Sequence, residues 1–138
     1  MTSTDGPSIP CVGAIVIDGA GRLLLVRRAN PPAQGTWSIP GGRVEPDEEA
    51  RDAVVRELAE ETGLWGEVER EVGTVERPAL GAGTYVIHDF LVRVDDAAAL
   101  RAADDALDVG WFTGPEVAAL ETSPGLRETL VGWGILNA

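Results

Sequence analysis

One stretch of the sequence has a helical pattern long enough to constrain the fold class. Residues 48–62 follow Asp47, a plausible N-cap, and stop before Gly63, a residue type that often ends helices. The apolar residues of this stretch fall on one side of a helical wheel: Val54, Val55 and Leu58. A single long amphipathic helix must bury that face against another layer, so the segments around it decide the fold.

The segments around this helix are short, apolar and rich in β-branched residues, which predicts strands. Residues 11–18 and 22–28 flank the turn signal Gly-Ala-Gly and predict a hairpin. Further strands are expected at 67–76, 84–94 and 107–113, and shorter helices at 114–120 and 125–136. Strands before and after one central helix indicate an α/β sandwich with a mixed sheet.

The chain has 138 residues, which suits a single domain, expected at 10–138 behind a flexible polar tail at 1–9. Its 23 acidic and 11 basic residues give a net charge of -12, which argues against nucleic-acid and membrane surfaces. An anionic small molecule would need a bridging cation. The lone Cys11 permits no intrachain disulfide, and no signal peptide or membrane span is evident, so we expect a cytoplasmic protein.

Three glutamates gather in the second half of the predicted helix: Glu57, Glu60 and Glu61. Their i, i+3 and i+4 spacing makes them neighbours, and each exposed like pair costs only about 0.2–0.5 kcal/mol. A solvated helix face therefore explains them adequately on energetic grounds. On the wheel, however, they flank the apolar face beside small alanines, and the glycine pair Gly41-Gly42 precedes the helix. Carboxylates opposite a backbone carbonyl form the kind of ligand set that Mg²⁺ takes together with phosphate oxygens.

The stretch from Gly42 to Leu64, GRVEPDEEARDAVVRELAEETGL, resembles the Nudix box. That pattern is Gly, five residues, Glu, seven residues, then Arg-Glu-hydrophobic-X-Glu-Glu-X-Gly-hydrophobic. All of its constrained positions match: Gly42, Glu48, Arg56, Glu57, Leu58, Glu60, Glu61, Gly63 and Leu64. The box covers 23 of 138 residues, and the segments GTWSIPGG and DVGWF outside it are also similar to the family. Asp47 departs from the Gly that relatives often carry at its position.

The resemblance implies a Nudix-type α/β/α sandwich with a mixed sheet and a central carboxylate-bearing helix. It also implies a hydrolase that uses Mg²⁺, or Mn²⁺, and water to cleave the diphosphate of a nucleoside diphosphate linked to another group. The family likeness makes Glu57 and Glu61 the first metal ligands and Glu60 the next, with the Gly41 carbonyl as a backbone ligand. Arg56 and Glu48 are expected to pair and to orient the helix. Which carboxylate accepts the proton of the water stays open.

A further catalytic carboxylate is expected from the loop before the strand that carries Trp111. Asp105, six residues earlier, is the candidate, with Asp104 as the fallback and a solvated loop aspartate as the alternative. Arg27 is the candidate for a phosphate contact, although arginines at strand ends are usually solvated.

Two further residues are assigned to the substrate. Gly42 provides bare backbone that a substrate can approach closely. Trp37 is a candidate for stacking on a base, with a packing role as the alternative.

Other residues that invite a functional role have structural explanations. His88 lies in an apolar strand and is expected to be structural or exposed; Phe90, Trp111 and Phe112 are expected in the core. Trp133 is expected to cover an apolar patch or to contribute to an interface between two copies of the chain.

The leading substrate class is ADP-ribose or a related ADP-sugar or dinucleotide such as NADH. Pro78, 14 residues beyond Leu64, is a weak sign of it. A pyrophosphohydrolase of standard or oxidised nucleoside triphosphates is the alternative. A binding domain without activity and an isopentenyl diphosphate isomerase are less favoured. The isomerase would need a well-placed cysteine, and the only one, Cys11, lies in a predicted buried strand.

Overall fold

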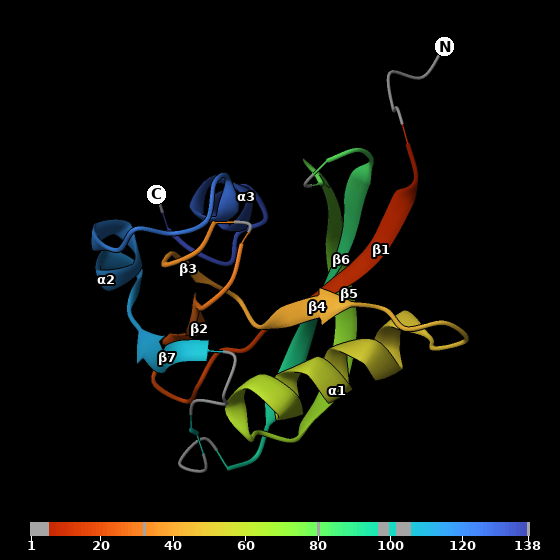
Figure 1. Ribbon diagram of the computed structural model, residues 1–138. Helices are drawn as coiled ribbons and strands as arrows, with labels where there is room; N and C mark the ends of the chain where they lie inside the picture. The colour runs from red at the N-terminus through yellow and green to blue at the C-terminus, as the bar shows by residue number, and fades with distance from the viewer. Residues whose placement is uncertain (1–5, 32, 80, 97–99, 102–105, 138) are drawn as a thin grey trace.

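The computed structural model describes residues 6–31, 33–79, 81–96, 100–101 and 106–137 (Figure 1). Two sheets are present. The larger has the strand order β4-β1-β6-β5, formed by Gly41–Arg43, Ser8–Ile15, Thr84–Val94 and Gly66–Pro78. In it β1 and β6 are parallel and the other neighbours antiparallel, so the predicted mixed sheet is confirmed. The smaller sheet is antiparallel, in the order β3-β2-β7, from Trp37–Ser38, Leu23–Arg28 and Ala106–Phe112.

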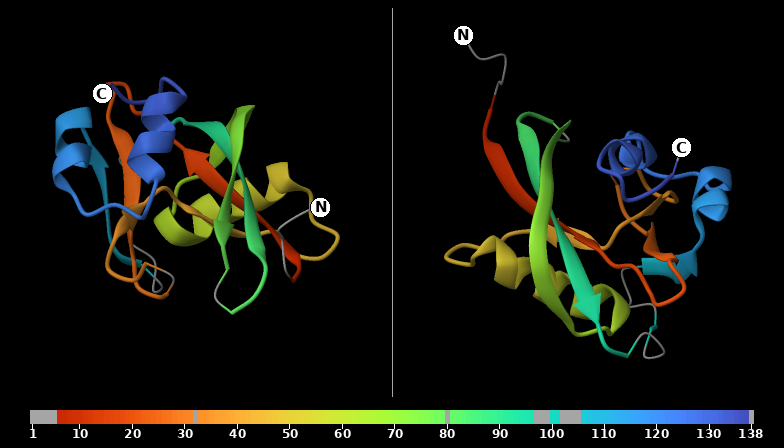
Figure 2. Two further views of the ribbon diagram at one scale, coloured as in Figure 1. Left: turned by 90° about the horizontal axis from the view of Figure 1, so that it is seen from above. Right: turned by 180° about the vertical axis from the view of Figure 1, so that it is seen from behind.

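In the described part of the chain, three helices lie against these sheets; Figures 1 and 2 show their arrangement. They are α1 (Ala50–Thr62), α2 (Gly114–Ala119) and α3 (Leu126–Gly132). The long helix α1 packs against the larger sheet, whereas α2 and α3 lie with the smaller sheet. Within the described part of the chain, no helix is long and apolar enough to cross a membrane.

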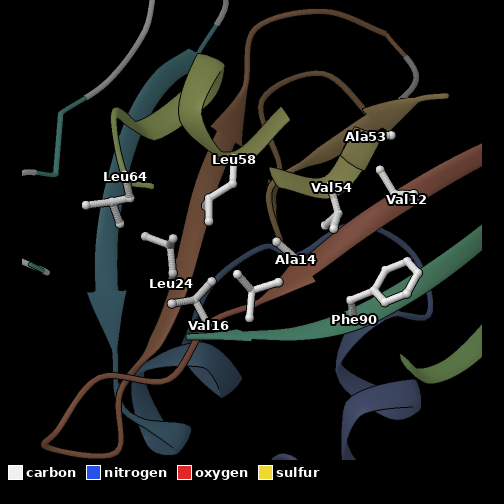
Figure 3. Packing of buried hydrophobic residues seen from close by; sticks show 10 residues of the cluster. Val12, Ala14, Val16, Leu24, Ala53, Val54, Leu58, Leu64 and Phe90 are labelled. Atoms are coloured by element: carbon white, nitrogen blue, oxygen red, sulfur yellow. The ribbon is translucent and has the colours of Figure 1, made fainter. Parts of the chain in front are cut away.

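Two clusters of buried side chains hold the layers together. The first core joins α1 to β1, β2 and β6 (Figure 3); its buried members are Val12, Ala14, Val16, Leu24, Ala53, Val54, Leu58, Leu64, Phe90 and Val92. The second core joins the sheets to α2 and α3, with buried Ile15, Leu23, Leu25, Ile39, Val117 and Leu130. The predicted apolar face of the long helix is confirmed for Val54 and Leu58, which are fully buried. Trp111 and Phe112 pack against these cores while partly buried.

The predicted hairpin of the first two strands is wrong beyond its turn. The turn itself forms, with the Asp18 carboxylate accepting backbone N–H bonds from Ala20 and Arg22 at 3.0 and 2.7 Å. Past the single bridge between Ile17 and Leu23, however, β1 and β2 enter different sheets. The reason is that β1 pairs along its length with β4 and β6, which leaves no edge for β2.

The first strand also begins earlier than expected. Ser8 and Ile9, assigned to the tail from sequence, pair with Thr84 and Tyr85 of β6. The apolar pattern that predicted this strand starts only at Cys11, whereas backbone pairing needs no apolar side chain and extends further.

The ends of α1 show one correct prediction and one error. The predicted stop at Gly63 is confirmed: its φ is 75° and its N–H donates to the Ala59 carbonyl at 2.9 Å. The predicted N-cap is wrong, because the helix begins at Ala50 with Glu49 as its N-cap. Asp47 lies in the preceding loop at a φ of 65°, in the left-handed region that glycine adopts at least cost.

Candidate active site

A glycine pair on β4 lies against the carboxylates of α1. Pairing with β1 sets Gly13 opposite Gly41 and Val12 opposite Gly42. A Cβ on Gly42 would collide with the Glu57 carboxylate, and one on Gly41 would collide with the Val12 carbonyl oxygen. Gly41 therefore requires glycine, because backbone occupies the space of a side chain, whereas a side chain at Gly42 would displace the Glu57 carboxylate.

Glu61 is tied to the same strand. Its Oε2 accepts a hydrogen bond from the Gly41 N–H at 2.9 Å. Glu57 and Glu61 lie one helical turn apart, so both reach the β4 side of the helix. The structure thus brings together three predicted residues: Glu57, Glu61 and Gly41.

These residues line one wall of a cavity of about 110 Å³. The remaining lining comes from the end of β2 and the loop after it: Val26, Arg27, Arg28, Ala29 and Asn30. Carboxylates and guanidinium groups therefore share one small space. Carboxylates attract a divalent cation and guanidinium groups attract phosphate oxygens, so the cavity suits a metal-bound diphosphate.

Arg56 organises the acidic side chains around the helix. Its Nε and Nη2 donate to the two Glu48 oxygens at 2.8 and 2.9 Å, which confirms the predicted pairing. Its Nη1 donates to Glu57 at 3.2 Å and to Glu60 at 3.1 Å, and its Nη2 also reaches the Arg43 carbonyl at 3.1 Å. One guanidinium thus joins the loop before the helix to a carboxylate that lines the cavity.

This pairing keeps Glu48 ionised. The hydrogen bonds from Arg56, with a further one from the Glu45 N–H, lower the pKa of Glu48 to about 2. Hydrogen bonding to Glu48 likewise raises the pKa of Arg56 above its ordinary value. The pair therefore stays charged over the whole pH range in which a hydrolase is assayed.

Glu60 does not join Glu57 and Glu61 at the cavity. Its half-exposed side chain bonds to Arg56 and lines a shallow groove on the outer side of α1 with Trp65. Within the described ranges, no three or more His, Cys, Asp or Glu side chains gather closely enough to hold a metal ion. A divalent cation at the cavity would meet two carboxylates, Glu57 and Glu61, and would need further oxygen ligands from a substrate or water.

A family model described as the NUDIX domain matches residues 7–131. The chain belongs to the NUDIX domain family. The family predicted from the box of residues 42–64 is confirmed, and so is its α/β fold with a mixed sheet.

Individual relatives of this NUDIX domain carry different activities in their names. An ADP-ribose pyrophosphatase from Methanocaldococcus jannaschii is 35% identical over 103 residues, covering 72% of this chain and 61% of the relative. A CTP pyrophosphohydrolase from Escherichia coli is 33% identical and is covered to 82%, as is this chain. A MutT protein from Methanosarcina mazei has a solved structure that matches with a TM-score of 0.82, 26% identity and 96% coverage of both chains. The chain thus spans less than two thirds of the archaeal pyrophosphatase.

The arginines of this NUDIX domain differ from the prediction in one respect. Arg27, the predicted phosphate contact, lines the cavity but also donates from Nε to the Gly35 carbonyl at 2.9 Å. Arg28, which was not among the residues predicted from the sequence, lines the same cavity. An irregularity in the pairing of β2 with β7 lies between Arg27 and Arg28, so strand alternation alone does not separate the two arginines.

The other predicted residues are absent from the cavity lining or lie outside the described part of the chain. Trp37 packs edge-on against Phe112, with ring centroids 4.9 Å apart, in the second core. His88 is partly exposed and bonds to Glu71 and Thr74 at 2.9 and 3.2 Å. Asp104 and Asp105 lie outside the described residues.

Proposed function

We propose that this NUDIX domain hydrolyses the diphosphate bond of a nucleoside diphosphate linked to another group. The observation that carries the proposal is the shared cavity of Glu57, Glu61, Arg27 and Arg28. It combines groups that bind a cation with groups that bind phosphate, in a chain whose net charge of -12 would otherwise repel such a substrate. The catalytic unit that we propose is a single cytoplasmic domain, expected at 10–138 from the sequence and beginning with β1 at Ser8 in the structure.

The donors present fit Mg²⁺, and Mn²⁺ equally. Glu57 and Glu61 offer hard carboxylate oxygens, and the Gly41 backbone lies in the same lining. When bound, such an ion would neutralise phosphate charge and lower the pKa of a water molecule. Glu60 would become a metal ligand only if its side chain left Arg56, which it contacts in this structure.

The chain's own residues would then position the reactants. Arg28 and Arg27 bind phosphate oxygens, and the bare backbone of Gly42 admits the Glu57 carboxylate beside them. Arg56 holds Glu57 through Nη1 while Glu48 fixes the guanidinium, so the carboxylate is oriented before the substrate arrives. One of the carboxylates, Glu57, Glu61 or the proposed Asp105, accepts the proton of the attacking water.

The first substrate class that we propose is ADP-ribose or a related ADP-sugar or dinucleotide such as NADH. The archaeal ADP-ribose pyrophosphatase supports it, and Pro78 lies at the end of β5. The second class is the nucleoside triphosphates, standard or oxidised. The similarity to the CTP pyrophosphohydrolase over 82% of both chains favours it.

The structure weakens the isomerase alternative. Cys11 is buried on β1, and burial raises the pKa of its thiol. A thiol in this environment is a poor acid or nucleophile.

A substrate panel with Mg²⁺ tests the proposal. ADP-ribose should give AMP and ribose 5-phosphate, NADH should give AMP and the reduced nicotinamide mononucleotide, and a triphosphate should give a monophosphate and pyrophosphate. Chelation of the metal should abolish turnover. Glu57→Gln provides the inactive control, and Glu67→Gln, at an exposed glutamate on β5, provides an active one. A failure to release mononucleotide from every substrate would contradict the proposed function.

A further inference from the structure

A row of residues runs across all four strands of the larger sheet. Gly41 of β4 pairs with Gly13 of β1, Gly13 with Asp89 of β6, and Asp89 with Gly73 of β5. Three of these four residues are glycines, so the row carries a single side chain, and side chains from other segments can lie over its backbone. The row begins at Gly41, which lines the carboxylate cavity, and its other residues lie progressively farther from that cavity.

The one side chain in this row is a buried carboxylate without a complete set of partners. Asp89 is 3% exposed, and its Oδ1 has no hydrogen-bond partner among the described residues. Burial raises the pKa of Asp89 to about 7, while Arg77 and His88 act to lower it and Glu71 to raise it. A buried carboxylate with an unsatisfied oxygen is costly, so it is retained where it has a role that packing does not explain.

The glycines are required by what lies over them. A Cβ on Gly13 would collide with Asp89 Oδ1 and come within 2.7 Å of the Ile39 Cδ1. A Cβ on Gly73 would collide with the Trp133 ring. The carboxylate therefore lies in the row with Ile39 over one neighbouring glycine and the half-buried Trp133 over the other. An aliphatic and an aromatic side chain beside a hydrogen-bonding group are what a flat heterocycle needs.

The distance between Asp89 and the carboxylate cavity suits a nucleoside diphosphate. Neighbouring strands lie about 4.8 Å apart, so Asp89 lies about 10 Å from Gly41, two strands away. Val12 and Phe90 pack under α1, so strand alternation places Asp89 on the opposite face of the sheet, the face of Ile15 and Leu91. A nucleoside attached to a diphosphate at Glu57 and Glu61 would pass the β4 edge to lie over this row, with the base at the far end. Asp89 is covered in this structure, so the base must displace a neighbouring side chain, such as that of Ile39, to reach it.

We propose that Asp89 is a specificity-determining residue, which accepts a hydrogen bond from the exocyclic amino group of the substrate's base. This inference rests on the proposed function and extends it to the choice of nucleoside. Bases with an amino group at the Watson–Crick edge, as in adenine and cytosine, supply the missing donor. Above pH 7, where Asp89 is ionised, a base with a carbonyl at that place sets an acceptor against the carboxylate and leaves that contact unsatisfied.

The test compares substrates that differ at this group and in the protonation of the adjacent ring nitrogen. They are CTP with UTP, and ADP-ribose with its inosine analogue. Wild type should show a kcat/KM ratio of about tenfold or more in favour of the amino compound, the range of a hydrogen bond to a charged group. Asp89→Leu should bring the ratio close to one by lowering kcat/KM for the amino compound. Asp89→Asn keeps an acceptor oxygen and should retain part of the ratio.

Two controls separate selectivity from folding. Asp18→Asn changes another aspartate in a distant turn and should leave the ratio unchanged. Thermal unfolding of each variant reports stability. If Asp89→Leu does not fold, Asp89→Asn carries the test. A variant that unfolds at a higher temperature with an unchanged ratio would show that Asp89 is only a structural group and overturn the inference.

Binding measurements separate this inference from the proposed function. Calorimetry with CMP and UMP, and with AMP and IMP, needs no turnover. Loss of base selectivity in the binding to Asp89→Leu, in a protein that hydrolyses nothing, would support the inference and refute the function. Hydrolysis by Asp89→Leu with an unchanged ratio of kcat/KM values would support the proposed function and overturn the inference. No preference in either the wild-type rates or the wild-type binding would overturn the inference.

Discussion

Arg56 and Glu48 form a two-point ion pair, with Nε and Nη2 of the arginine donating at 2.8 and 2.9 Å. The same guanidinium reaches Glu57, so the loop before α1 and a cavity carboxylate are held by one group. A lysine has a single ammonium and cannot reproduce this fork.

Arg56→Lys should therefore lower kcat by about 10–100-fold, because Glu57 loses its fixed orientation. The comparison is Arg51→Lys, the same substitution at an exposed arginine of the same helix. Steady-state rates with the best substrate, and unfolding curves in urea, give the two readouts. Equal kcat losses in both variants would refute an orienting role for Arg56.

Gly42→Ala tests the close approach of β4 and α1. The added Cβ would collide with the Glu57 carboxylate and push it out of the cavity. Activity should fall at least about tenfold, since a small displacement of a catalytic group is costly. Gly19→Ala is the matched control, since a Cβ there meets no atom within 4 Å. Far-ultraviolet circular dichroism checks that the fold is retained; full activity in Gly42→Ala would contradict the packing described.

Asp47→Gly should stabilise the protein. Asp47 adopts a φ of 65°, and a left-handed conformation costs most side chains roughly 1–2 kcal/mol, less for aspartate. A gain of about 0.5–1 kcal/mol in the free energy of unfolding is expected, partly offset by the greater entropy of glycine in the unfolded chain. Urea denaturation at fixed pH measures it. A loss of stability would show that the Asp47 side chain makes contacts that offset its strain.

Asp89 should make stability depend on pH. Its pKa rises from 3.8 in the unfolded chain to about 7 in the folded one, so between these values the folded state binds the extra proton. The resulting stability is present in full below about pH 4 and is lost as pH rises through 7. Asp89→Asn should abolish this loss, which is at most about 4 kcal/mol. Unfolding free energies of both proteins should diverge between pH 5 and 7 and change little in their difference from pH 7 to 8. Curves that are parallel from pH 5 to 8 would contradict the shifted pKa.

Local signals explain which parts of the structure were predictable. The stop at Gly63, the strand at 84–94 and the pairing of Arg56 with Glu48 depend on residues close in sequence or on a fixed motif, and all three are confirmed. The hairpin failed because the partners of β1 lie far along the chain, in β4 and β6, and alternation does not identify partners.

The candidate site was likewise predictable where a fixed motif defines it, and not where it depends on residues far apart in the sequence. Glu57 and Glu61 were predicted through the resemblance to the Nudix box, but the box could not show that Glu60 contacts Arg56 instead of the cavity. Arg28 was not predicted, because the choice between two adjacent arginines depends on the orientation of β2. Asp89 gave no signal, since Ile39 and Trp133, which lie over the neighbouring glycines, come from segments far from it in the sequence.

The central claim is that Glu57 and Glu61 hold a divalent cation against the diphosphate at this cavity. The direct test is Mn²⁺ binding, measured by electron paramagnetic resonance, together with kcat, in Glu57→Gln, Glu61→Gln and Glu60→Gln. The first two should bind Mn²⁺ at least about tenfold more weakly and lose orders of magnitude in kcat, because each removes one oxygen charge from the cavity. Glu60→Gln should lose much less, since its side chain lies on the outer side of α1. Wild-type Mn²⁺ affinity and turnover in Glu57→Gln and Glu61→Gln would contradict the account.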